Sequence, residues 1–79
     1  IKFYGSVYMK ISYKKLSKLL IDLIIGKTEL RHRTGIASST FTKLRNDKEV
    51  SMSIIRKICE ELNCGIGDVL EFKKDNLQQ

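Results

Sequence analysis

The sequence predicts a compact all-α domain of five short helices, preceded by a short extended arm. Apolar residues recur at helical spacing in successive segments, and the connections between these segments are short. The chain has no proline and only five glycines, which argues against a linker-rich or multi-stranded protein. Its 79 residues make one domain at most, and 42% hydrophobic residues are enough for one small core. We divide the chain into an arm (residues 1–11), a helical domain (12–72) and a polar tail (73–79).

Residues 1–11 alternate between apolar and polar positions, which is typical of a short strand. The apolar side carries Ile1, Phe3, Val7, Met9 and Ile11. A lone strand in a helical domain must pair with something, so we weigh pairing with a second copy of the chain against a disordered arm. Met9 could also be the natural first residue, with residues 1–8 an upstream extension. The sequence leaves these alternatives open.

The first predicted helix begins at Ser12, a residue suited to cap it. Four leucines then follow at the i, i+3, i+4, i+7 spacing of an amphipathic helix, namely Leu16, Leu19, Leu20 and Leu23. Ile21, Ile24 and Ile25 widen the apolar arc beyond what one small core usually needs. This helix is therefore either deeply packed or carries a self-association surface.

Two short helices separated by a glycine follow in the middle of the chain. Gly26 precedes the first of them, which runs from Lys27 to Thr34. Gly35 then frees the backbone for a left-handed turn before the second, which runs from Ser38 to Arg45. Two helices joined by a tight turn that contains glycine form a helix-turn-helix.

The helix from Ser38 to Arg45 has two different faces. Phe41 and Leu44 are three residues apart and therefore share the inner face. The opposite face carries Ser38, Ser39, Thr42 and Lys43. A helix with an apolar inner face and a small, polar, cationic outer face can lie in a groove of DNA.

The C-terminal half predicts two further helices. Residues 46–47 tolerate left-handed geometry and end the third helix. Ser51 caps a fourth helix over residues 52–62, whose apolar positions again follow helical spacing. Residues 66–70 form a short fifth helix, and Phe72 seals the base of the core. The polar tail after it is expected to fray.

Positive charge gathers around the predicted helix-turn-helix. The chain carries a net charge of +6 and has a pI of about 9.5. Such charge suits an anionic partner such as nucleic acid or a membrane surface, although it also serves solubility. Residues 27–48 hold six Lys and Arg side chains against two carboxylates, which gives +4 of the total. These cations are Lys27, Arg31, Arg33, Lys43, Arg45 and Lys48.

Residues 12–72 resemble the Xre family of bacterial and phage regulators, whose helix-turn-helix domains are Cro-like or lambda-repressor-like. The segment LRHRTGIASSTFTKLRND carries the resemblance, through Leu30, Gly35, Ile36, Phe41 and Leu44. The downstream segment VSMSIIRKICEELNCGIGDVLEF is similar to the fourth and fifth helices of that family. The resemblance implies a cytoplasmic transcriptional regulator that binds double-stranded DNA as a homodimer.

The resemblance also implies DNA-binding positions. In that family the third helix enters the major groove, and the positions near base edges are here Ala37, Ser38, Ser39, Thr42 and Lys43. Lys43 could donate to O6 or N7 of guanine. Phosphates are contacted from the start of the second helix and the loop after the third, which here are Lys27, Asn46 and Lys48, with Arg45 making this loop more basic.

Some positions depart from the family pattern. Arg31 stands where a small residue is usual, so its side chain must extend outward from the crossing of the two helices. Ala37 stands where a capping Ser or Thr is common, so Ser38 could cap the third helix instead. The dimer surface is unassigned, and its candidates are the N-terminal strand or a base formed by Ile66, Val69, Leu70 and Phe72.

Other classes of function have less support. No carboxylate pair, nucleophile–base pair or phosphate-binding glycine loop is visible, so we expect neither an enzyme nor a small-molecule substrate. Cys59, Cys64 and one histidine are too few for a structural zinc site, so we expect two reduced thiols and no cofactor. No segment reaches the roughly 18 apolar residues that cross a bilayer.

The remaining alternative is a protein-interaction module, such as the antitoxin component of a toxin–antitoxin pair. The excess apolar residues of the first helix and the alternating arm would then contact the partner protein. RNA binding usually requires exposed aromatic side chains, and the third helix shows none because Phe41 belongs to its inner face.

Overall fold

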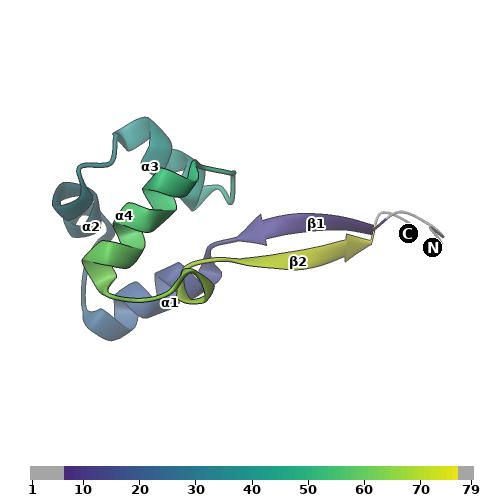
Figure 1. Cartoon of the computed structure of the whole chain (residues 1–79), viewed down its shortest axis with the longest axis horizontal. Helices are drawn as coiled ribbons and strands as arrows, with labels where there is room; N and C mark the ends of the chain where they lie inside the picture. Colours follow the sequence, from purple (N-terminus) through teal and green to yellow (C-terminus); the bar gives the residue numbers. More distant parts are fainter. Residues whose placement is uncertain (1–6, 77–79) are drawn as a thin grey trace.

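The computed structural model describes residues 7–76 and shows a helical body with a projecting two-stranded ribbon (Figure 1). The elements are, in order, β1 (Val7–Ser12), α1 (Lys14–Leu23), α2 (Lys27–Thr34), α3 (Ser38–Arg45), α4 (Met52–Leu62), a 3-10 turn (Ile66–Asp68) and β2 (Glu71–Asn76). The bounds predicted for α2, α3 and α4 are confirmed. No helix within these residues is long and apolar enough to cross a membrane.

The predicted all-α class of five helices is wrong in two respects. Residues 7–76 contain four α-helices, because the expected fifth helix is only the 3-10 turn Ile66–Asp68. They also contain a strand pair, since β1 lies antiparallel to β2 with Lys10 opposite Lys73 and Ile11 opposite Phe72. The chain is therefore mostly helical, with a small sheet formed by its two terminal segments.

The partner of the N-terminal strand is the chain's own C-terminal segment. Neither a second copy nor a disordered arm is needed for residues 7–12, and the tail does not fray over residues 73–76. The sequence did not predict β2, because EFKKDN contains one apolar residue and does not alternate between apolar and polar positions. The predicted positions at Ile1 and Phe3, and the last three residues of the tail, lie outside the described residues.

The core is built by apolar side chains from all four helices. Leu30, Ile58 and Val69 are completely buried, and they pack with Leu16, Leu20, Ile36, Phe41, Leu44, Ile55 and Leu62. Phe72 does not seal the base of this core, because 61% of it is exposed on the ribbon. Val69, and not Phe72, is buried in the core. The Val69 side chain is therefore not available to a dimer surface.

The ends of α1 differ from the prediction. Tyr13, and not Ser12, is the N-cap residue, and the Ser12 hydroxyl accepts a hydrogen bond from Lys14 N at 3.3 Å. At the other end, Ile24 adopts a left-handed conformation and is 89% exposed. Ile21 is 75% exposed, so the deep packing considered for this helix does not extend to either isoleucine.

Candidate nucleic-acid interface

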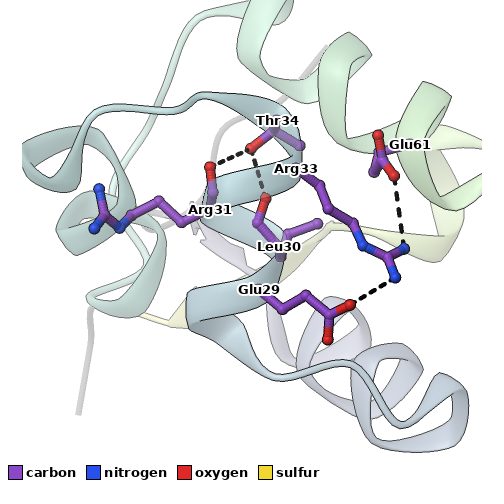
Figure 2. A network of polar contacts seen from close by, with 6 residues as sticks. All are labelled: Glu29, Leu30, Arg31, Arg33, Thr34 and Glu61. Carbon is purple, nitrogen blue, oxygen red and sulfur yellow. Dashed lines mark hydrogen bonds and ion pairs between the residues drawn. The ribbon is translucent and has the colours of Figure 1, made fainter.

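The turn between α2 and α3 fixes the position of the second helix. Gly35 has a φ of +72°, as predicted for a left-handed turn, and its N–H donates to Arg31 O at 2.9 Å. The Thr34 hydroxyl donates to Leu30 O at 2.8 Å and closes the last turn of α2 (Figure 2). Ile36 is buried directly after the turn and anchors the start of α3 to the core.

The outer face of α3 is exposed along its whole length. Phe41 and Leu44 are buried, whereas the predicted base-edge residues Ala37, Ser38, Ser39, Thr42 and Lys43 are all exposed. The structure therefore brings these five residues together on one open surface. The burial of the two apolar side chains orients that surface outward.

The cap of α3 is Ala37, so the expectation that Ser38 could cap the helix is wrong. Ala37 has extended geometry and Phe41 N donates to its carbonyl at 3.0 Å, which makes Ser38 the first helical residue. The Ser38 hydroxyl is therefore not used as a cap. The Thr42 hydroxyl donates to Ser38 O at 3.0 Å, so toward a ligand it presents a methyl group and an acceptor oxygen.

A basic cleft of about 170 Å³ separates α2 from α3. It is lined by Lys27, Thr28, Arg31, Ser38, Phe41, Thr42 and Arg45. Arg31 is half-buried and points away from the Arg33 side of α2 (Figure 2), so the outward extension expected for it leads into this cleft. Thr28 and Arg31 belong to the surface because they line this cleft. The sequence did not indicate this, because neither residue lies near α3 along the chain.

Arg33 serves a different purpose from the other cations of this region. Its guanidinium lies 2.6 Å from a Glu29 carboxylate oxygen and 3.6 Å from one of Glu61 (Figure 2). The pair with Glu29 lies within α2, and the pair with Glu61 connects α2 to α4. Exposed pairs of this kind contribute little stability. One of the six cations counted in the sequence is therefore committed to carboxylates on the side away from Arg31.

The loop after α3 is held by a tyrosine from the start of α1. Tyr13 is 3% exposed; its N–H donates to Asp47 Oδ1 at 3.1 Å, and its hydroxyl donates to Lys48 O at 2.7 Å. Asp47 has a φ of +56°, as expected where the helix stops. Burial, followed by the nearby carboxylates of Asp47 and Glu49, raises the pKa of Tyr13.

The hydrogen bonds of Tyr13 keep the exposed residues Asn46 and Lys48 next to the C-terminal end of α3. The sequence did not single out Tyr13, because its partners lie 34 and 35 residues further along the chain. The sequence feature that could have indicated this role is the position of Tyr13 at the start of a helix, directly before Lys14 and Lys15.

The two cysteines are free thiols beside the core, away from this surface. Cys59 and Cys64 are both half-buried, and Cys59 packs against the core as expected. Burial, with a smaller effect of the neighbouring Cys59, raises the pKa of the Cys64 thiol. A raised pKa keeps Cys64 protonated and makes it a poor nucleophile near neutral pH.

The fold and this surface agree with the comparisons to known proteins. A Cro/C1-type HTH DNA-binding domain matches residues 15–75. An uncharacterized HTH-type transcriptional regulator, YozG of Bacillus subtilis (strain 168), is 36% identical over 62 residues, which cover 70% of this chain and 74% of YozG. The crystal structure of the transcriptional regulator VanUg (Form II) is 44% identical with a TM-score of 0.83, over 95% of this chain and 96% of that one. The chain thus belongs to the Cro/C1-type helix-turn-helix family and is a DNA-binding transcriptional regulator.

Proposed function

We propose that the protein recognises a specific double-stranded DNA sequence by placing α3 in the major groove, and that it does so as a homodimer. The observation that supports this most is the exposed outer face of α3, which a buried Phe41 and Leu44 hold outward. A major groove about 12 Å wide admits one α-helix, and bases present distinct donor and acceptor patterns there. In this proposal the sequence preference comes from α3 itself.

In this proposal the exposed residues of α3 and its flanking segments are assigned either to bases or to phosphates. Lys43 is the longest donor on the outer face and is assigned to guanine O6 or N7. Ala37 and the Thr42 methyl are assigned to thymine methyl groups, and Ser38 and Ser39 to either donors or acceptors. Phosphates are assigned to Lys27, Arg45, Asn46 and Lys48, which flank α3 at the cleft and the following loop.

A selection experiment tests this assignment. Bound sequences are recovered from a random duplex pool at near-physiological salt for the wild type, Lys43→Ala and the matched control Lys57→Ala, which removes an exposed lysine from α4. We expect a palindrome with half-sites about 34 Å apart for the wild type and the control. Lys43→Ala should lose preference at one base pair, by about 1–3 kcal/mol. Recovery of no enriched sequence by the wild type would contradict sequence-specific recognition.

A second candidate function is capture of a protein partner, for example by an antitoxin. The observation that favours it is the apolar end of α1, where Ile21, Leu23 and Ile24 are exposed. Large exposed apolar groups that lie together are typical of interaction sites. Binding that shows no sequence preference and vanishes as salt rises, together with a stable monomer, would favour this candidate over the first.

A further inference from the structure

A second and larger basic groove lies beside the recognition surface. It has a volume of about 420 Å³ and runs between α3, the start of α1 and the root of the ribbon. Its charged lining consists of Lys10, Lys14, Lys27, Arg45 and Lys73, with Asp47 as the single carboxylate. Five cations against one carboxylate give this lining a formal charge of +4, so the groove is strongly positive. Such a groove attracts an anion that has several charges in a row.

This groove is continuous with the cleft between α2 and α3. Lys27, Phe41 and Arg45 line both of them. The two depressions therefore form one basic surface, which begins at α3 and extends onto β1 and β2 where they leave the helical body (Figure 1). A polyanion that contacts Lys27 and Arg45 on one side can thus continue onto the ribbon.

The register of the ribbon places two of its lysines, Lys10 and Lys73, on one face, and both line the groove. Lys10 lies directly opposite Lys73, so their side chains share one face of the strand pair. Ile11, one residue after Lys10, lies opposite Phe72, one residue before Lys73, so these apolar side chains share the other face of the strand pair. This register brings two cationic side chains to the root of the ribbon, beside the groove.

Lys14 and Lys73 differ from their neighbour Lys15. The Lys15 ammonium lies 3.7 Å from a Glu71 carboxylate oxygen and 3.4 Å from Gly67 O. Lys14 and Lys73 are exposed, and neither forms a salt bridge with any side chain that the structure describes, which are those of residues 9–74. Their charges are available to a ligand in the groove.

We propose that the root of the ribbon is a second contact with the DNA backbone. Lys14 and Lys73, next to Lys10, bind phosphates that flank the segment contacted by α3. This inference rests on the proposed function, because it requires α3 to be seated on the same duplex. It assigns the ribbon a role in affinity and in the length of the DNA site, and no role in base preference.

The salt dependence of binding tests the proposal. The probe is the duplex recovered by selection, extended by about one helical turn at each end. Affinities are measured by fluorescence anisotropy between about 50 and 200 mM salt for the wild type and for Lys14→Gln/Lys73→Gln. The matched control, Lys18→Gln/Lys57→Gln, removes the same charge from positions outside the groove. Thermal unfolding of each variant checks that it is folded.

We expect the slope of log K against log salt to decrease in magnitude by about 1.8 for Lys14→Gln/Lys73→Gln, since each lost phosphate contact removes about 0.9. The control should keep the wild-type slope, and the selected sequence should be the same for all three proteins. Hydroxyl-radical footprints should lose their outermost protection in Lys14→Gln/Lys73→Gln alone. An equal slope for both double variants would overturn the proposal and leave the proposed function intact. A wild type that selects no sequence would instead overturn the proposed function.

Discussion

The left-handed conformation of Ile24 makes a substitution to glycine stabilising. Ile24 has φ +58° and ψ +44°, and its N–H donates to Ile21 O at 3.1 Å. The following N–H, of Ile25, donates to Leu20 O at 2.9 Å. These two bonds form the closing motif that usually places glycine at the left-handed position. Here a β-branched residue occupies it, which is unfavourable for the backbone.

The size of the effect follows from two opposing terms. A left-handed conformation costs a residue with a Cβ about 1–2 kcal/mol, and glycine is free of this cost. Glycine also lowers the free energy of unfolding by about 0.5–1 kcal/mol, because it makes the unfolded chain more flexible. The Ile24 side chain is 89% exposed, so removing it forfeits little burial. The difference between the two terms is about 0–1.5 kcal/mol. At the midpoint of this range, Ile24→Gly should raise the free energy of unfolding by about 0.8 kcal/mol and the melting temperature by about 3–6 °C.

Ile21→Gly is the matched control, because it removes the same type of side chain from α1, three residues before Ile24. Ile21 lies inside α1 and is 75% exposed. Glycine in a helix interior is less favourable than isoleucine by about 0.5 kcal/mol, so the melting temperature should fall. Thermal and urea unfolding, followed by circular dichroism at one protein concentration, compare the variants. If Ile24→Gly melts below the wild type, or if both variants shift in the same direction, the strain at Ile24 is refuted.

Three further outcomes are expected. Gly35→Ala should lower the free energy of unfolding by about 1 kcal/mol through backbone strain alone, since nothing lies within 4 Å of the added Cβ; an unchanged urea midpoint would contradict this. Tyr13→Phe leaves the carbonyl of Lys48 without its partner at 2.7 Å, so it should cost about 0.5–1.5 kcal/mol in urea unfolding and weaken DNA binding on all sequences alike. The raised pKa values of Tyr13 and Cys64 mean that the unfolded chain loses these protons first as pH rises, so stability should fall above about pH 9. The double variant Tyr13→Phe/Cys64→Ala should show a smaller decline in melting temperature over that range, and an equal decline would refute this cause.

Local patterns predicted the elements that local forces create. The helices α2, α3 and α4 have the predicted bounds because apolar spacing, glycine turns and exposed polar faces act within a few residues of one another. The left-handed turns at Gly35 and Asp47 were predictable for the same reason. Since α3 carries its inner and outer faces in one short segment, the candidate base-edge residues could also be named from the sequence.

The features that join distant segments could not be predicted in this way. The pairing of β1 with β2, the hydrogen bonds of Tyr13 to the loop after α3 and the basic groove all unite residues more than 30 positions apart. The burial of Val69 and the exposure of Phe72 likewise depend on which of these two apolar residues packs into the core when the C-terminal segment folds against the helices. The sequence by itself determined the helix-turn-helix and its outward face, because those depend on backbone preference and helical period. Only the tertiary structure decided how that face continues onto the ribbon, because contacts between distant segments form only when the whole core packs.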